Sequence, residues 1–310
     1  MEVDVLTYNI EGLPWPGRSG RAHHLQEISR VLRQLRAEGQ APHIVLFQEV
    51  FSRAARRAVE ETGYPTLVPG PEARDRRPAP VNGSLPGRSR PLKGELGLRA
   101  LSSGLVIATD FPVLAHKTMP FPRRSCAGYD CLANKGVQLA RLRIPGLPGF
   151  LDIYNTHMNS QDTSGVPEPR HLAAHQAQTV ALSAFIARNS DGPEPFIFGG
   201  DLNMRHSEPR YAELQRLKPI HIVHRWCVER PAACDVRESW DGDEPWMDTQ
   251  DLQLFWPGAH VDVRPAVVEA MFDGAAEPRL SDHDGFRVRY TLSWSVADAP
   301  PTGPCTPPDW

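Results

Sequence analysis

Short apolar runs separated by turn-forming residues dominate the chain. Their length and their β-branched and aromatic content predict strands at residues 3–9, 44–49, 104–108, 136–142, 149–155, 196–198, 251–255 and 286–292. Other stretches repeat apolar residues every three or four positions, which predicts helices from Leu25 to Leu35, ended by Gly39, and from Leu172 to Ile186. Strands that alternate with amphipathic helices predict a layered α/β fold.

Polar and ionisable residues gather at or beside the ends of these predicted strands. A solvated strand end explains any one of them taken singly, but an open layered sheet brings strand ends together at one rim. The residues are Asn9, Glu49, His157, Asp201, Asn203, Asp251, Asp282 and His283. Carboxylate, amide and imidazole groups at one rim suit a site that positions a phosphate and an attacking water.

The stretch FIFGGDLNM, residues 196–204, carries the strongest single signal. Its apolar run stops at Gly199 and Gly200, which let a backbone turn tightly or approach a ligand closely. Asp201 and Asn203 lie two positions apart, so in an extended chain their side chains point to the same side. A strand that ends in a polar surface turn is the simpler alternative.

Several pieces of the sequence occur in an order that is similar to a known family. YNIEG, LFQEV, NTHMNS, GGDLNM, QDLQLF and SDHDG, between residues 3 and 293, resemble the endonuclease/exonuclease/phosphatase superfamily. The resemblance implies a deoxyribonuclease-like four-layer α/β sandwich, in which two packed mixed β-sheets are flanked by helices. It also implies hydrolysis of phosphoesters with Mg²⁺, or with Mn²⁺ in its place. We assign residues 1–295 to this catalytic domain.

The resemblance implies a metal site at one part of the rim. Glu49 resembles the principal metal ligand, with Asn9 beside it and Asp282 near the metal. These side chains suit Mg²⁺, which prefers oxygen ligands and keeps several waters, so that one or two carboxylates suffice. The alternatives are a solvated strand end for Glu49 and a helix N-cap for Asp282.

The remaining rim residues resemble the catalytic groups of the superfamily. Asp201 and Asn203 resemble the pair that positions the attacking water and the phosphate, and His157 resembles the histidine on the phosphate side. His283 resembles the base-side histidine, with Asp251 as the carboxylate that orients it. Such a pairing fixes one tautomer and favours the protonated ring. Asp201 and His283 both remain candidates for accepting the proton of water.

Residues 102–142 indicate a branch of the superfamily. SSGLVIATDFPVL and MPFP, followed by the segment from Asp130 to Val137, are similar to neutral sphingomyelinases. We therefore predict that Lys135 contacts the substrate phosphate with Asp130 as its partner, and we predict a phosphate contact for Asn159. A solvated strand start is the alternative for Lys135. The expected substrate is a sphingomyelin-type phospholipid at a membrane surface.

Other substrates and roles stay open. YNIEGL and SDHDG also resemble tyrosyl-DNA phosphodiesterases, and DNA-repair endonucleases share the core motifs, so DNA is the alternative substrate. A binding protein that keeps the fold without catalysis predicts gaps in the polar set, and the sequence has none. The 34 Lys and Arg against 37 Asp and Glu give a formal net charge of −3, which argues against a nucleic-acid binder that relies on bulk positive charge.

Composition adds expectations about the periphery. Residues 69–99 are rich in Pro and Arg and predict a mobile surface insertion, either a solvated loop or a contact for an anionic membrane or polyanion. Residues 296–310 form a Pro-rich C-terminal tail.

Compartment and assembly are less constrained. The sequence shows no signal peptide and no apolar run long enough to span a bilayer, so we expect the protein in the cytoplasm or, after removal of a leader, secreted. Cys126 with Cys131, and Cys227 with Cys234, could close small loops in an oxidising compartment, and free thiols are the alternative. We expect a monomer.

Overall fold

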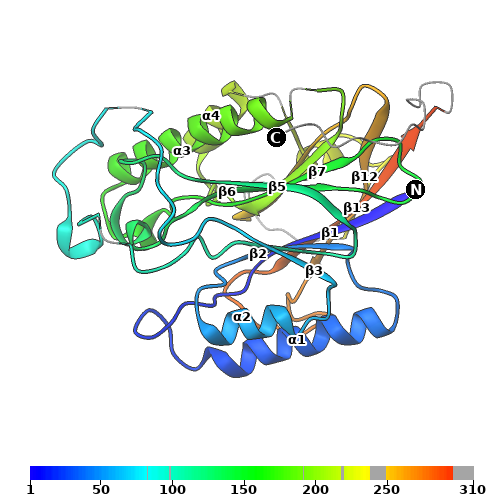
Figure 1. The fold of residues 1–310 in the computed structure, drawn as a ribbon, viewed down its shortest axis with the longest axis horizontal. Helices are drawn as coiled ribbons and strands as arrows, with labels where there is room; N and C mark the ends of the chain where they lie inside the picture. The colour runs from blue at the N-terminus through cyan, green and yellow to red at the C-terminus, as the bar shows by residue number, and fades with distance from the viewer. Residues whose placement is uncertain (82, 98, 191, 218–219, 238–248, 296–310) are drawn as a thin grey trace.

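Two β-sheets lie face to face at the centre of the molecule, and helices cover their outer sides (Figure 1). The computed structural model describes residues 1–310 except 82, 98, 191, 218–219, 238–248 and 296–310, so the predicted tail lies outside the described residues. The arrangement confirms the predicted four-layer α/β sandwich.

The first sheet joins the earliest strands of the chain to late ones. Strand β1 pairs in parallel with β2 and antiparallel with β13. Across the described residues the strand order is β10 (Asp235–Arg237), β12 (Val261–Met271), β13 (Gly285–Trp294), β1 (Glu2–Asn9), β2 (Ile44–Gln48), β4 (Val106–Thr109) and β3 (Thr66–Pro69).

The second sheet is built from the middle of the chain. Strands β7 and β8 run parallel, and their other neighbours run antiparallel to them. Its described order is β5 (Val113–Pro120), β6 (Gly136–Leu142), β7 (Leu151–His157), β8 (Phe196–Asp201), β11 (Asp251–Trp256) and β9 (His221–Ile222). Both sheets are therefore mixed, as predicted.

Helices α1 (Arg21–Ala37) and α2 (Arg53–Glu60) cover the outer face of the first sheet (Figure 1). The apolar residues of α1 lie on one stripe and are buried in a cluster with residues of β1 and β2. The helix ends where the sequence predicts, because Gly39 has the left-handed φ of 70° that commonly closes a helix. Ser52 caps α2 by accepting a hydrogen bond from Ala55 N at 3.1 Å.

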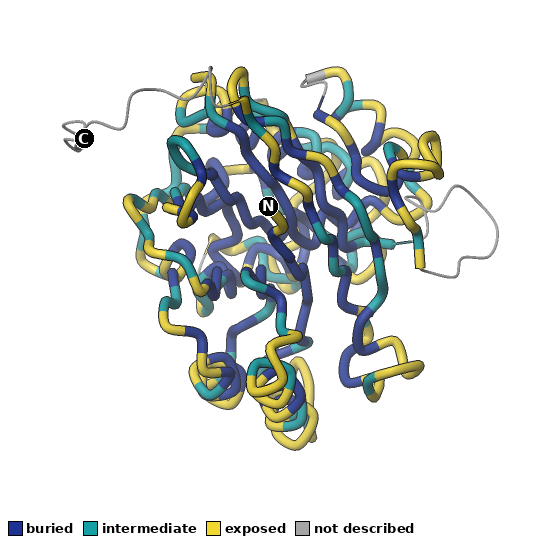
Figure 2. The backbone as a smooth tube through the Cα atoms, turned by 90° about the vertical axis from the view of Figure 1, so that its right-hand side faces the viewer, coloured by how far each residue is buried: buried dark blue, intermediate teal, exposed yellow. Residues whose placement is uncertain are grey.

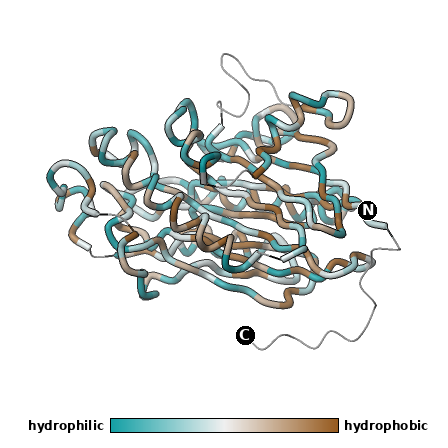
Figure 3. The backbone as a smooth tube through the Cα atoms, turned by 90° about the horizontal axis from the view of Figure 1, so that it is seen from above, coloured by the Kyte–Doolittle hydropathy of each residue, from teal (hydrophilic) through white to brown (hydrophobic). Residues whose placement is uncertain are grey.

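Helices α3 (Glu168–Asn189) and α4 (Glu208–Leu217) cover the second sheet. Figure 2 shows buried central strands and exposed outer helix faces, and Figure 3 shows that hydrophobic residues concentrate in the strands. This is the burial pattern that amphipathic helices on a sheet produce. The short elements are α5 (Val223–Val228) and the 3₁₀ turns η1 (Pro91–Lys93), η2 (Gly128–Leu132) and η3 (Asp162–Ser164).

Buried polar side chains link the two sheets across an otherwise apolar core. Gln48 Nε2 in β2 donates to Asn155 Oδ1 in β7 at 2.8 Å, and Asn155 Nδ2 donates to the Phe47 carbonyl at 3.1 Å. Gln253 Nε2 in β11 donates to the Val5 carbonyl at 2.9 Å. Because an unpaired polar group in the core costs free energy, these bonds favour one alignment of the sheets over shifted ones.

Gly199 and Gly200 lie inside β8, whereas the sequence analysis ended that strand at Phe198. A Cβ atom at Gly199 would lie 2.6 Å from Leu46 Cδ1 of the facing sheet, and one at Gly200 would lie 2.1 Å from the Thr156 carbonyl oxygen. The glycines therefore allow close approach of the protein's own strands. The strand continues past them and ends on an acidic residue at the rim.

The sequence pattern misses strands at or near the sheet edges and some short helices. These elements are β3, β5, β9, β10, β12, α2, α4 and α5. Strand β5 alternates between half-buried and exposed positions, so it lacks a continuous apolar run. Strand β12 contains Pro265 and a register shift between Pro265 and Val267, and proline is ordinarily a signal against a strand.

Most residues of the Pro- and Arg-rich segment 69–99 are exposed or half-buried, and the segment is docked against other parts of the molecule (cyan, at the left of Figure 1). Glu95 pairs with Arg170 of α3 at 2.8 Å and accepts a hydrogen bond from Gly128 N at 2.8 Å. Arg77 donates to Asn134 Oδ1 at 2.9 Å. Composition alone did not predict these contacts, because each needs a partner distant in sequence.

Both suspected cysteine pairs form disulfides, Cys126–Cys131 and Cys227–Cys234. The fifth cysteine, Cys305, is not among the described residues. Across the part of the chain that the structure describes, no helix combines the length and the apolar character needed to cross a membrane.

Candidate active site

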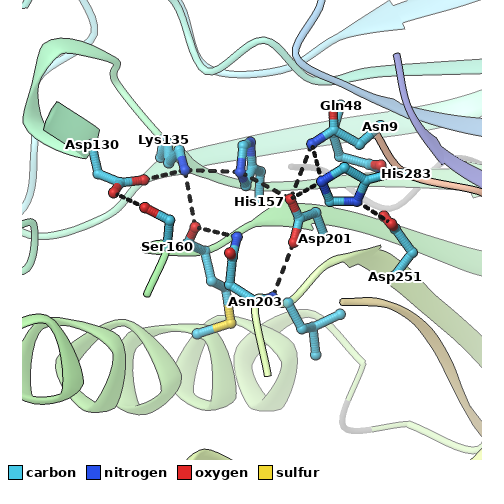
Figure 4. A network of polar contacts seen from close by, with 12 residues as sticks. Asn9, Gln48, Asp130, Lys135, His157, Ser160, Asp201, Asn203, Asp251 and His283 are labelled. Atoms are coloured by element: carbon cyan, nitrogen blue, oxygen red, sulfur yellow. Dashed lines mark hydrogen bonds and ion pairs between the residues drawn. The ribbon is translucent and has the colours of Figure 1, made fainter. Parts of the chain in front are cut away.

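Strand ends from both sheets meet at one rim (Figure 4). Asn9 ends β1 and lies opposite Gln48, which ends the parallel strand β2. In the second sheet, His157 ends β7 and lies opposite Asp201, the last residue of the parallel strand β8. Asp251 begins β11, which runs antiparallel to β8, and it pairs in register with Asp201. The sheet topology thus gathers polar residues that are far apart in sequence.

The carboxylate of Asp201 lies at the centre of this site. Its Oδ2 accepts a hydrogen bond from Asn9 Nδ2 at 3.0 Å and lies 3.2 Å from His157 Nε2 and 3.9 Å from His283 Nε2. Burial would raise the pKa of Asp201, but His157, then His283 and Lys135, hold it well below its ordinary value. Asp201 is therefore ionised at neutral pH and can only accept hydrogen bonds.

His283 and Asp251 form a tight pair. His283 Nδ1 lies 2.5 Å from Asp251 Oδ2, and the opposite ring nitrogen, Nε2, lies 3.5 Å from Asn9 Nδ2. Burial lowers the pKa of His283, but Asp251 more than offsets this and raises the pKa to about 10. Burial raises the pKa of Asp251 to about 6. Both directions are consistent with one proton held between Nδ1 and the carboxylate.

Lys135 links the site to η2. Its Nζ donates to Asp130 Oδ1 and, at 3.0 Å, to the Met158 carbonyl, and it lies 2.8 Å from His157 Nε2. Ser160 Oγ donates to the other oxygen of Asp130 at 2.5 Å. Burial would raise the pKa of Asp130, but the charge of Lys135 lowers it. The predicted pairing of Lys135 with Asp130 is confirmed.

These contacts join into one buried network across the rim (Figure 4). Each carboxylate along it lies beside a lysine or a histidine, and Lys135 and His157 are neighbours at its centre. In order, its members are Asp130, Lys135, His157, Asp201, His283 and Asp251.

Asn203 and Asn159 lie in the loops that follow Asp201 and His157. Asn203 has a left-handed φ of 52°; its backbone N donates to Asp201 Oδ1 at 3.0 Å, and its Nδ2 donates to the Met158 carbonyl at 3.2 Å. Asn159 is fully buried, and its Oδ1 accepts a hydrogen bond from Ala127 N at 2.8 Å. This placement does not support the predicted phosphate contact of Asn159, whose side chain instead holds a loop.

Arg210 of α4 is a site residue that the sequence analysis missed. It is fully buried, and its Nη1 donates to the carbonyl groups of Asn159 and Asn203, both at 2.7 Å. Burial lowers the pKa of Arg210 to about 10. One guanidinium thereby connects the loops after β7 and β8. An arginine on a helix is ordinarily solvated, so no sequence signal marks it.

Ser160 and Gln48 were also missed as site residues. Each lies inside a motif of the family resemblance, Ser160 in NTHMNS and Gln48 in LFQEV. Their positions within these motifs were the available signal.

Glu49 and Asn9 fit a divalent cation. Glu49 directly follows β2 with a left-handed φ of 60°, and its Oε2 is buried without a hydrogen-bond partner among the described residues. Asn9 Oδ1 accepts only one hydrogen bond there, from Glu11 N at 3.0 Å. A buried carboxylate oxygen without a partner costs free energy that a bound cation would offset.

Beyond Glu49 and Asn9, the described structure offers few further ligands for a cation. Within the described residues, no group of three or more His, Cys, Asp or Glu is arranged to hold a metal ion. Asp282, a predicted neighbour of the metal, has a side chain that is 49% exposed and pairs with Arg18 at 3.0 Å. Arg18 also pairs with Glu11 at 2.6 Å, and these acidic groups together with Glu49 raise its pKa against the effect of burial. A site with only a few protein ligands is consistent with Mg²⁺, because this ion keeps several of its water ligands.

A four-layer sandwich with an acidic and imidazole-bearing rim defines the deoxyribonuclease-like class of phosphoesterase folds. The chain belongs to the endonuclease/exonuclease/phosphatase family, whose model matches residues 6–283. The resemblance found in the sequence is thereby confirmed.

Solved structures with this fold include a sphingomyelinase, a bacterial toxin and TDP2. Sphingomyelinase C from Streptomyces griseocarneus has a TM-score of 0.64 and 20% identity, covering 93% of this chain and 99% of that one. A beta toxin variant from Staphylococcus aureus with bound magnesium ions has a TM-score of 0.63 and 16% identity, with coverage of 93% and 99%. A humanized TDP2 from D. rerio has 0.59 and 14%, with 94% and 99%. No curated protein sequence matches the chain.

Proposed function

We propose that the protein is a metal-dependent phosphodiesterase that cleaves its substrate by attack of water. One observation carries this proposal: a buried network from Asp130 to Asp251 lies at the rim where β2 ends, and Glu49, which directly follows β2, keeps a buried carboxylate oxygen that has no partner in the described structure. The network supplies groups that can hold and exchange protons, and the unpartnered oxygen supplies a place for a cation.

The implied metal is Mg²⁺, with Mn²⁺ as a substitute. Glu49 and Asn9 would hold it, and Asp282 would contribute from the surface side after separating from Arg18. When bound, such an ion offsets the negative charge that develops on the phosphoryl group and the leaving oxygen. The beta toxin structure with magnesium ions supports this choice of metal.

The ionisable side chains divide into acceptors and proton carriers. Asp201 is ionised and accepts hydrogen bonds, which suits it to orient the attacking water. Asp251 holds Nδ1 of His283, so the opposite nitrogen, Nε2, which lies 3.9 Å from Asp201 Oδ2, is the ring atom that gains or loses a proton. The ring is protonated at neutral pH, so it becomes a base only after losing that proton, and positive charge bound beside Glu49 would favour the loss.

Lys135 and His157 form the part of the site that would contact the substrate phosphate, which we call the phosphate side. Lys135 Nζ and His157 Nε2 lie 2.8 Å apart, so both can face one phosphoryl oxygen. A fixed positive charge at this position would stabilise the negative charge of the transition state. Asn203 holds the neighbouring loop through its bond to the Met158 carbonyl.

The substrate that we propose is a phospholipid of the sphingomyelin type, cleaved to ceramide and phosphocholine. Support comes from the similarity of residues 102–142 to neutral sphingomyelinases, from the buried placement of Lys135 in that segment, and from the fold shared with a sphingomyelinase C. DNA is the competing substrate, because YNIEGL and SDHDG also resemble tyrosyl-DNA phosphodiesterases.

Hydrolysis of a matched substrate panel tests this proposal. Sphingomyelin vesicles, phosphatidylcholine vesicles, and single- and double-stranded DNA are each incubated with Mg²⁺ and with chelator, using the wild type and His283→Ala. We expect Mg²⁺-dependent release of phosphocholine from sphingomyelin that the variant lacks. Faster cleavage of DNA would replace the lipid substrate, and turnover of no substrate by folded, Mg²⁺-loaded protein would favour the non-catalytic alternative.

A further inference from the structure

A cavity of about 600 Å³ lies between the docked segment 69–99 and the loop closed by the Cys126–Cys131 disulfide. Its volume falls in the range of pockets that bind small ligands. None of the rim residues described above lines this cavity. The cavity is therefore separate from the candidate active site at the strand ends, which we call the strand-end site.

The charged groups that line this cavity are mostly positive. The arginines are Arg77, Arg99, Arg123, Arg124 and Arg170. Among the described residues, Glu95 is the acidic group that lines the cavity, and both of its oxygens are engaged by Arg170, at 2.9 and 2.8 Å. The pKa of Glu95 is lowered to about 2 because Arg170 and backbone donors offset its burial. Glu95 therefore neutralises Arg170, and the other four arginines have no ion pair with a carboxylate among the described residues.

Arg77 and Arg99 share one neutral acceptor. Arg77 Nε and Arg99 Nη1 both donate to Asn134 Oδ1, at 2.9 and 2.8 Å. No carboxylate of the described residues is ion-paired with either guanidinium. Burial, and then the charge of Arg99, lower the pKa of Arg77 to about 10. Two like charges held together without a counter-charge raise the free energy of the empty cavity, and a bound anion would lower it.

We propose that this cavity binds an anion that carries a phosphate group. Guanidinium groups are planar donors that match phosphate oxygens in pairs, and several of them converge here on one space. The volume exceeds that of one phosphate ion, so the remainder of a phosphorylated molecule has room. The inference holds whether or not the strand-end site is catalytic, because no rim residue takes part.

The cavity lies next to the phosphate side of the strand-end site. Asn134, which both arginines hold, directly precedes Lys135, and Cys131 on the cavity wall directly follows Asp130. The phosphate could belong to a soluble molecule or to the headgroup of an anionic lipid at a membrane surface. Both sources offer the same chemistry to the arginines.

Calorimetric titration with pyrophosphate, in chelator, tests the site. Arg123→Gln/Arg124→Gln removes two exposed cavity arginines. Arg33→Gln/Arg53→Gln on α1 and α2 removes the same charge from the opposite layer. We expect saturable binding that the cavity variant weakens at least about tenfold, or about 1.4 kcal/mol, and the control variant leaves unchanged.

Lys135→Ala distinguishes the cavity from the strand-end site, since pyrophosphate held there would depend on Lys135. Equal affinity in the cavity and control variants, absence of saturable binding, or loss only in Lys135→Ala would each overturn the proposal.

Vesicle co-sedimentation identifies the source of the phosphate. Phosphatidylcholine vesicles with and without phosphatidic acid are compared for the wild type, Arg123→Gln/Arg124→Gln and Arg33→Gln/Arg53→Gln. Binding that requires phosphatidic acid and falls only in the cavity variant assigns a lipid headgroup. Pyrophosphate binding without vesicle binding assigns a soluble phosphorylated molecule, and vesicle binding that falls equally in both variants would show bulk charge attraction instead.

Discussion

Two parts of the strand-end site differ in how their charges are satisfied: the buried network from Asp130 to Asp251, and the region around Glu49. Within the network, the buried carboxylates of Asp130, Asp201 and Asp251 each lie beside Lys135 or a histidine. At the position of the proposed metal, Glu49 has a buried oxygen without a partner in the described structure. The network is complete within the protein, whereas the proposed function requires a cation at Glu49. Under that proposal, protonation controls the network and metal concentration controls the region around Glu49.

Removing the proposed metal should have the largest effect on activity, because Glu49 then lacks its cation. We expect chelation to abolish hydrolysis and added Mg²⁺ or Mn²⁺ to restore it. Glu49→Gln should keep the fold and raise the Mg²⁺ concentration needed for half-maximal activity, since a neutral amide replaces a charged ligand. Glu60→Gln, at the exposed end of α2, is the control. Full turnover in excess chelator would contradict the assignment.

His283→Ala removes the imidazole that pairs with Asp251 in the buried network. We expect a loss of about 10²- to 10⁴-fold in kcat, the range for lost acid–base catalysis, with little change in the circular dichroism spectrum. Asp251→Asn should lose much of the same factor, and the double variant should be barely worse than His283→Ala because the two act as a unit. His116→Ala on β5 is the control. Fully multiplicative losses would show that the two residues act independently.

Lys135→Ala removes the fixed positive charge of the phosphate side. We expect kcat to fall by about 10²-fold, the scale of one lost transition-state donor, while binding to substrate vesicles is largely retained. Lys117→Ala, on the edge strand β5, gives a matched loss of charge away from the rim. Intact kcat on sphingomyelin vesicles would remove Lys135 from the reaction and weaken the lipid assignment.

Arg210→Met tests whether the loops after β7 and β8 depend on one guanidinium for their stability. We expect the free energy of unfolding to fall by about 3 kcal/mol in urea titrations, because the Asn159 and Asn203 carbonyls lose a charged donor. Arg216→Gln on the same helix breaks only an exposed ion pair with Glu213 and should change stability by less than about 0.5 kcal/mol. Equal effects of the two would refute the structural role.

The pH dependence of stability without metal tests the pairing of His283 with Asp251. The pKa of His283 is raised from 6.5 to about 10, so between these pH values the native protein holds a proton that the unfolded chain releases. This stabilisation is present near pH 6.5 and lost as pH rises toward 10. The stability difference between wild type and His283→Gln should shrink over that range. In an Asp251→Asn background the dependence should largely vanish, and its persistence would assign it elsewhere.

The central strands and the rim residues were predictable because each leaves a local signal. Strands buried on both faces need continuous apolar runs, as at residues 44–48 and 196–198, and side chains at their ends cannot join that apolar interior. Polar residues at such boundaries therefore stand out in sequence. The edge strand β5 was missed because exposure on alternate positions removes the same signal.

Residues that act through distant partners were not predictable. Arg210 is indistinguishable in sequence from a solvated helical arginine, and only the loops from β7 and β8 bury it. Asn159 was expected to face phosphate, but its side-chain oxygen accepts a hydrogen bond from the backbone N of Ala127. The segment 69–99 has the composition of a free loop, yet Arg170 and Asn134 hold it through Glu95 and Arg77.

The sequence by itself determined the layered fold, the strands that form its centre and the kinds of groups at their ends, because apolar periodicity and motif order are properties of the chain. Only the tertiary structure decided which groups meet. Asp201 contacts Asn9 and His157, and Asp251 contacts His283, because parallel and antiparallel pairing brings these strand ends to one rim. Charge and burial depend on such neighbours, so the shifted pKa values of the rim and the clustered arginines of the cavity emerge only after folding.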